Sequence, residues 1–99
     1  MKNKIQVEGT ICTDVSLKRN DKSNRLSVHF VLKNTLGNWK NYINCKAFGK
    51  LAEEICEKYE KSDEVLITGQ LMTDFYNETT KLNTSKFTYV KIQEIKKSE

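Results

Sequence analysis

Residues 42–48, Tyr-Ile-Asn-Cys-Lys-Ala-Phe, constrain the fold more than any other stretch, because their side chains alternate strictly in character. The small and aliphatic side chains share one face: Ile43, Cys45 and Ala47. Successive side chains of a β-strand point to opposite faces of its sheet, so this alternation predicts a half-buried strand with that face in the core. Cys45 is accordingly expected to be a small core residue.

The opposite face of the same strand combines rings with polar and basic groups: Tyr42, Asn44, Lys46 and Phe48. Bases of a single-stranded nucleic acid stack on aromatic rings, and its phosphates bind cations, so this face suits such a ligand. The alternative is that both rings pack under a loop or against a partner subunit. The strand by itself favours neither interpretation.

Length and composition narrow the class of protein. The 99 residues are enough for one domain, 1–99, with one modest core. The net charge of +4 and pI near 9.0 suit a polyanionic partner, although basic proteins also have other partners. There is no apolar run of membrane-spanning length and no secretory signal, so we expect a cytoplasmic protein without a membrane partner.

The cysteines and the single histidine give no pattern of metal ligands or disulfides. The three cysteines are odd in number and far apart, and His29 stands alone. We therefore expect neither a zinc site nor a disulfide framework, and no cofactor. A loose basic cluster, Lys18, Arg19, Lys22 and Arg25, fits a solvated loop and a phosphate contact equally well.

Periodicity along the whole chain predicts an all-β fold with one short helix. Strands are expected at 4–14, 25–34, 42–48, 64–76 and 86–95, a helix at 51–61, a loop or hairpin connection at 16–24 and a polar loop at 77–85. Five strands with a helix between the third and fourth make the pattern of the OB-fold barrel, whose strands and loops bind oligonucleotides.

Three details refine this expectation. Gly9 in the first strand predicts a bend or a close approach of another backbone. Gly37 marks a turn that joins the second and third strands into a hairpin. Which face of the last strand is buried is open, because Val90 and Ile92 suit one face and Phe87 and Tyr89 the other. In the fourth strand, Val65, Ile67, Gly69 and Leu71 are expected to face inward.

Trp39 follows the predicted turn directly and is next to Lys40. A tryptophan at a polar hairpin tip has little to pack against, so it is expected to contact a ligand or a partner chain, and ligand contact is favoured.

Residues 42–53, Tyr-Ile-Asn-Cys-Lys-Ala-Phe-Gly-Lys-Leu-Ala-Glu, closely resemble the central segment of bacterial single-stranded DNA-binding proteins, in which a strand ends at Phe-Gly-Lys and leads into a helix. Residues 3–9 look like the opening strand of that family and residues 65–73 like its fourth strand. The resemblance covers nearly the whole chain in the same order.

The resemblance implies a set of DNA-binding residues. Tyr42 matches the aromatic position that begins the third strand, Phe48 the phenylalanine of Phe-Gly-Lys, and Tyr76 the aromatic that follows Gly-Gln-Leu-x-Thr. A further family aromatic aligns nearest to Leu36, and Trp39 is expected to replace it. The polar and basic residues expected on the same face are Lys33, Lys40, Asn44 and Lys46. The family also implies a homo-oligomer, a dimer or a tetramer.

The chain departs from the family pattern in several respects. Glu8 and Asp74 place negative charge on strands where the family is neutral or basic, and the hairpin over 34–41 looks short. The acidic tail by which family members recruit other genome-maintenance proteins does not follow the domain. We expect an isolated domain or a tail-less member, such as those of phages, plasmids and mobile elements.

The sequence hypothesis is therefore non-enzymatic, largely sequence-independent binding of single-stranded DNA in replication, recombination or repair. The alternative is an adaptor similar to primosomal protein N, which residues 7–13 and 30–32 somewhat resemble, with another replication protein as its main partner. RNA binding is a third possibility, because stacking does not distinguish the sugars. Catalysis is not expected, since no Ser/His/Asp cluster or Gly-rich phosphate loop is present.

Overall fold

The computed structural model describes residues 1–73 and 88–98. The elements in chain order are β1 (Ile5–Ile11), β2 (Ser16–Arg19), β3 (Leu26–Leu36), β4 (Trp39–Phe48), α1 (Lys50–Lys58), β5 (Glu64–Thr73) and β6 (Thr88–Lys97). Tyr76, Phe87 and the predicted loop over 77–85 lie outside the described residues.

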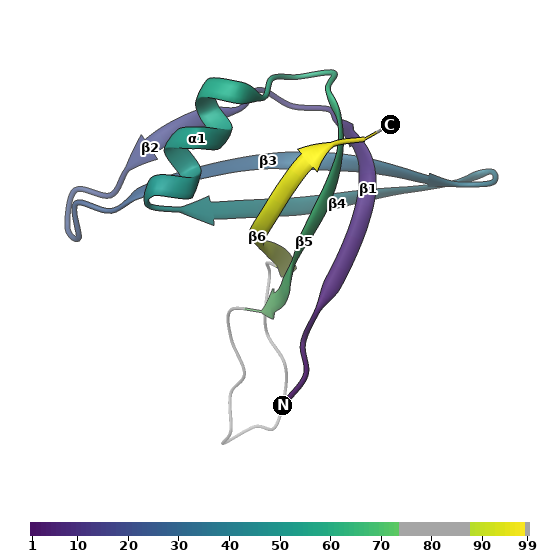
Figure 1. Cartoon of the computed structure of the whole chain (residues 1–99), viewed down its shortest axis with the longest axis horizontal. Helices are drawn as coiled ribbons and strands as arrows, with labels where there is room; N and C mark the ends of the chain where they lie inside the picture. The colour runs from purple at the N-terminus through teal and green to yellow at the C-terminus, as the bar shows by residue number, and fades with distance from the viewer. Residues whose placement is uncertain (74–87, 99) are drawn as a thin grey trace.

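The sheet closes into a five-stranded barrel. Its strands follow the order β1, β5, β6, β4, β3, and a β1–β3 pairing at Thr10–Lys33 and Ile11–Leu32 completes the ring. All pairings are antiparallel except β4–β6, which is parallel. The helix α1 lies between β4 and β5 in the chain and packs against β3 and β4 (Figure 1). The predicted barrel with one helix after its third strand is confirmed.

The core is made by the inward faces of these strands and by α1. Its buried members are Ile11, Val28, Phe30, Leu32, Cys45, Ala47, Ala52, Ile55, Val65, Ile67, Val90 and Ile92. Cys45 is buried as expected, and desolvation raises its pKa to about 12. Val90 and Ile92 are inside, which settles the open question about the last strand and turns Tyr89 outward.

Two glycines allow neighbouring backbones to approach closely. A Cβ on Gly9 would collide with the carbonyl oxygen of Lys33, and a Cβ on Gly69 with that of Lys91. Gly9 thus has the close backbone approach expected from its place in mid-strand. Both glycines lie where strands of a small barrel must bend strongly.

Two local expectations were wrong. The first part of the predicted loop over 16–24 is the strand β2, which pairs with β3 although all four of its side chains are exposed. Leu71, which was expected to face inward with Val65, is 43% exposed near the end of β5. Alternation cannot reveal a strand with no buried face, nor the point at which a strand leaves the barrel.

The hairpin of β3 and β4 is long rather than short. Its strands are paired continuously from Ser27–Phe48 to Leu36–Trp39, and Gly37, with φ of 58°, forms the turn. Figure 1 shows the hairpin extending well beyond the barrel. Trp39 is therefore the first residue of β4, paired with Leu36 beside the turn, and 72% of its surface is exposed.

Candidate nucleic-acid interface

Aromatic and basic side chains meet on the outer face of β4 and β6. We call this face the aromatic shelf; its residues are Tyr42, Asn44, Lys46, Phe48, Tyr89 and Lys91. The parallel pairing places Tyr89 beside Asn44 and Lys91 beside Lys46. Because outward side chains in each strand are two residues apart, this register brings two rows of outward side chains together.

Each of two rings on the shelf has a cation over it. The Nζ of Lys46 lies 4.6 Å from the centre of the Tyr89 ring. The Cζ of Arg25 lies 4.5 Å from the centre of the Phe48 ring, and the Nζ of Lys91 lies 5.9 Å from it. These are cation–π distances, so the positive charges are held beside the rings rather than dispersed in solvent.

Asn44 is held in place by its neighbour on β3. The Nε2–H of His29 donates a hydrogen bond to Oδ1 of Asn44 over 3.0 Å, because an amide oxygen can only accept. His29 is thus a support for the shelf, and the amide nitrogen of Asn44 remains as a donor. The sequence alone did not indicate this pairing.

An apolar groove opens where the shelf meets β1. It has a volume of about 430 Å³, and the rings of Tyr42 and Tyr89 stand among its lining residues. Aliphatic residues supply most of the remaining wall: Ile5, Val7, Ile43, Leu71 and Val90. The groove gives the two tyrosine rings an apolar setting.

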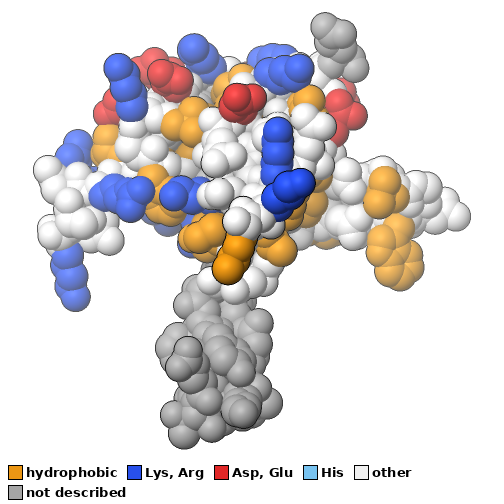
Figure 2. All heavy atoms as spheres, turned by 60° about the horizontal axis from the view of Figure 1, so that its bottom comes forward, with side chains coloured by type: hydrophobic (Ala, Val, Ile, Leu, Met, Phe, Trp, Pro, Cys, Tyr) orange, Lys and Arg blue, Asp and Glu red, His pale blue; other side chains and the backbone are white. Residues whose placement is uncertain are grey.

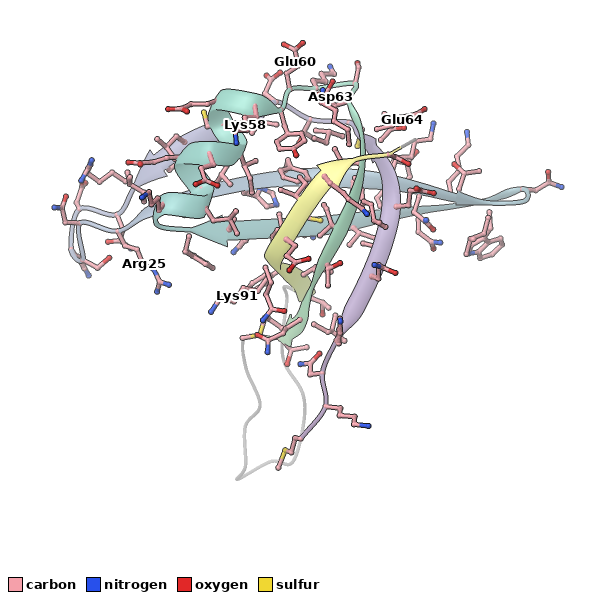
Figure 3. The ribbon with its side chains drawn as sticks, in the orientation of Figure 1. Arg25, Lys58, Glu60, Asp63, Glu64 and Lys91 are labelled. Atoms are coloured by element: carbon pink, nitrogen blue, oxygen red, sulfur yellow. The ribbon has the colours of Figure 1, made fainter. Side chains whose placement is uncertain are left out.

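Charge is unevenly distributed over the molecule. Figure 2 shows Lys and Arg side chains over the front of the barrel and both acidic and basic side chains along its upper edge. In Figure 3, Arg25 and Lys91 point away from the barrel on the side opposite Glu60 and Glu64. The attraction of a polyanion is therefore stronger on the shelf side of the barrel than at the end near α1, where acidic side chains offset the lysines.

One acidic group near α1 is itself stabilised in its charged form. The backbone N–H of Glu60 donates a hydrogen bond to Asp63, and Lys97 forms an ion pair with the same carboxylate at 3.1 Å. These contacts lower the pKa of Asp63 below 3.8, with the backbone hydrogen bond as the larger cause. Asp63 is therefore charged at neutral pH and paired with Lys97.

The residues predicted from the sequence fall into two groups. Tyr42, Asn44, Lys46 and Phe48 lie together on β4. Tyr42 is 61% exposed, whereas the other three are half-buried. Lys33 pairs with Tyr42 across the hairpin. Trp39 and Lys40 are farther out, at the hairpin tip, and Tyr76 lies outside the described residues.

Sequence reasoning missed two members of this surface as binding residues, Tyr89 and Lys91, and left a phosphate contact by Arg25 open. The signal for Tyr89 and Lys91 was present, because choosing Val90 and Ile92 as the buried pair turns both outward. The place of Arg25 over Phe48 could be found only from the structure, since nothing in the sequence indicates that contact.

Within residues 1–73 and 88–98, no group of three or more His, Cys, Asp or Glu side chains is placed to hold a metal ion. The described part of the chain also contains no helix of the length and apolarity needed to cross a membrane.

Comparison with known proteins bears directly on this surface. A model of the Single-strand binding protein family matches residues 2–97. The chain belongs to this family. Family membership supports the binding of single-stranded DNA in general. The rings and cations of the shelf suit the same ligand. No curated protein matches the chain by sequence.

Solved structures of the family share the fold. The SSB domain of a Synechococcus sp. protein is 14% identical, with a TM-score of 0.77, over 96% of this chain and 94% of its own. A deletion mutant of the single-stranded DNA binding protein from Thermus aquaticus is 19% identical, with a TM-score of 0.78, over 99% of this chain. This chain spans only 42% of the length of the Thermus aquaticus chain.

Proposed function

We propose that the aromatic shelf binds single-stranded DNA largely independently of sequence, by stacking bases on its rings and holding phosphates with its cations. The observation that carries the proposal is the set of cation–ring pairs on one face: Lys46 over Tyr89, and Arg25 and Lys91 over Phe48. Every base has a π-face and every nucleotide a phosphate, so this chemistry requires no particular sequence.

The cation over Phe48 must be displaced when a base binds. A guanidinium 4.5 Å above Phe48 occupies the place that a base would take. When a base stacks on the ring, Arg25 must swing aside, and its guanidinium can then bind a phosphate of the strand. Each stacked base contributes about 1–3 kcal/mol of binding free energy. Binding therefore replaces the cation–π contact of Arg25 with Phe48 by a stacking contact of the base and a charge-assisted hydrogen bond from Arg25 to a phosphate.

The rest of the DNA path follows the long hairpin. Lys33 lies beside Tyr42, and Lys40 and Trp39 continue toward the tip. We include these residues and Tyr76 in the proposed path. In this proposal the protein, as a homo-oligomer, covers single strands exposed during replication, recombination or repair.

The experiment is a titration of fluorescently labelled oligo(dT) followed by anisotropy, with duplex DNA and poly(U) as competitors. Tyr89→Leu removes a shelf ring that lies under Lys46. Tyr59→Leu is the matched control, because Tyr59 is also a half-buried ring under a lysine, Lys97, but packs beside α1 instead. Circular dichroism confirms that each variant is folded.

We expect tight binding of oligo(dT) by the wild type, weak competition by duplex DNA, and a loss of about 5- to 150-fold in affinity for Tyr89→Leu, which corresponds to one lost stacking contact. Tyr59→Leu should bind like the wild type. Equal losses in the two folded variants, or no binding of oligo(dT) at low salt, would rule out the shelf as the binding surface.

A further inference from the structure

A small polar slot adjoins the Phe48 end of the shelf. It has a volume of about 230 Å³ and is lined by Asn20, Ser23, Arg25, Ser27 and Phe48. This volume is below the roughly 300–1,000 Å³ typical of pockets for drug-sized ligands, so the slot suits a single ring. One wall is the aromatic ring and the others are hydrogen-bonding groups.

The loop that forms the polar walls is held by its own hydrogen bonds. The backbone N–H of Asn20 donates to the carbonyl oxygen of Arg25 over 2.9 Å, and the N–H of Asn24 donates to the carbonyl oxygen of Asn20 over 2.7 Å. The side-chain Oδ1 of Asn20 accepts from the N–H groups of Lys22 at 2.9 Å and Ser23 at 3.3 Å. The loop around Asn20 is therefore positioned before any ligand arrives, which lowers the entropic cost of binding, and only the Arg25 side chain must leave the face of Phe48.

These hydrogen bonds leave the slot rich in donors. Because Oδ1 of Asn20 is already used twice, its amide nitrogen is the group left to meet a ligand. No hydrogen bond within the described chain engages that nitrogen. The guanidinium of Arg25 can only donate, and the hydroxyls of Ser23 and Ser27 can do either.

A donor-rich slot favours a base whose edge accepts hydrogen bonds. Thymine and uracil present the O4 carbonyl, and guanine presents O6 and N7. Cytosine and adenine place an amino group at the corresponding position, where it would face another donor.

We propose that this slot receives one base stacked on Phe48 and selects a keto base, thymine, uracil or guanine, through the amide nitrogen of Asn20. The inference rests on the proposed single-strand binding and adds a specificity-determining residue to it. Most of the strand is held without regard to sequence, and the loop over residues 20–25 reads one position.

The test compares short deoxyuridine and deoxycytidine oligomers, which differ at position 4 of the base but have similar stacking faces. Asn20→Asp retains Oδ1 for the backbone N–H groups and replaces the amide donor by an acceptor. The readout is the ratio of the two affinities, because the added negative charge weakens both complexes alike. Asn38→Asp, at the far turn of the hairpin, introduces the same charge change away from the slot.

We expect the wild type and Asn38→Asp to prefer deoxyuridine by about 3- to 10-fold, the value of one net hydrogen bond. The ratio should fall to about one or invert in Asn20→Asp. Equal binding of both oligomers by the wild type, or an unchanged preference in Asn20→Asp, would overturn the proposed base selection by the slot and leave the proposed single-strand binding intact. If the wild type binds neither oligomer, both the proposed single-strand binding and the proposed base selection are wrong.

Discussion

Replacing Gly69 by alanine tests whether the barrel needs the close approach of β5 and β6. A Cβ at this position would collide with the carbonyl oxygen of Lys91 and lie 2.9 Å from its carbonyl carbon and 3.1 Å from Cγ1 of Val90. The register of the two strands also shifts between Thr68 and Gly69, so the backbone here is already irregular.

The size of the effect follows from what must move. Overpacking costs about 1–3 kcal/mol, and the upper end applies because the obstacle is backbone rather than a flexible side chain. A cost of about 3 kcal/mol lowers the Tm of a domain of this size by about 12–24 °C, at about 4–8 °C per kcal/mol. Because the displaced strand carries Tyr89 and Lys91, Gly69→Ala should also weaken binding of oligo(dT).

Thermal unfolding followed by far-ultraviolet circular dichroism measures the effect. Thr73→Ala is the control, because Thr73 is an exposed residue at the end of the same strand. Surface substitutions usually change stability by at most about 0.5 kcal/mol, so we expect this control to unfold within about 4 °C of the wild type. If Gly69→Ala also unfolds with the wild type, the two backbones are not as close as the argument requires.

Three further outcomes are expected. Burial raises the pKa of Cys45 to about 12, so its thiol should resist iodoacetamide near pH 8 in the native protein while the thiols of Cys12 and Cys56 react. Mass spectrometry measures the alkylation, and rapid reaction of all three thiols would contradict the burial of Cys45. The pKa of Asp63 is lowered first by the hydrogen bond from the Glu60 N–H and then by Lys97. The charged carboxylate therefore stabilises the fold above the unfolded-state pKa of 3.8, and this stabilisation is lost as pH falls through the folded-state pKa. The Tm of Asp63→Asn should therefore lie below that of the wild type at neutral pH, and the gap should close as pH falls from 3.8 through the lower folded-state pKa; a gap that stays constant over that fall in pH would refute the assignment. The fluorescence of Trp39, the one tryptophan in the chain, should be quenched by oligo(dT), whereas tight binding without quenching would place the hairpin tip outside the DNA path.

Much of the barrel could be predicted from alternation because most of its strands have one buried face. Residues 42–48 and the strand around Phe30 show that pattern clearly, and their inward residues are buried, with Ile43 partly so. The short strand β2 could not be found, since all its side chains are exposed and only its pairing with β3 defines it.

The binding surface was predictable only within a strand. The alternation of β4 placed Tyr42 and Phe48 on the same outward face, but the partners of that face come from elsewhere. Lys91 reaches the shelf through the parallel β4–β6 pairing, which brings together segments far apart in the sequence. Arg25 reaches it through a loop conformation in which Asn24 adopts φ of 56°. Neither pairing register nor loop conformation is encoded in local periodicity.

The salt dependence of oligo(dT) binding in two double variants shows whether DNA lies on the shelf side of the barrel. One replaces the shelf lysines, Lys46→Gln with Lys91→Gln. The other replaces lysines in and after α1, Lys58→Gln with Lys61→Gln. Figure 3 shows Lys91 and Lys58 on different sides of the barrel.

Each phosphate contact on a single strand contributes about 0.7 to the slope of log K against log salt. We expect the shelf variant to lower the magnitude of that slope by about 1.4, for two lost contacts, and the control variant to leave it unchanged. An unchanged slope in the shelf variant, or an equal reduction in both variants, would show that the phosphates are held elsewhere.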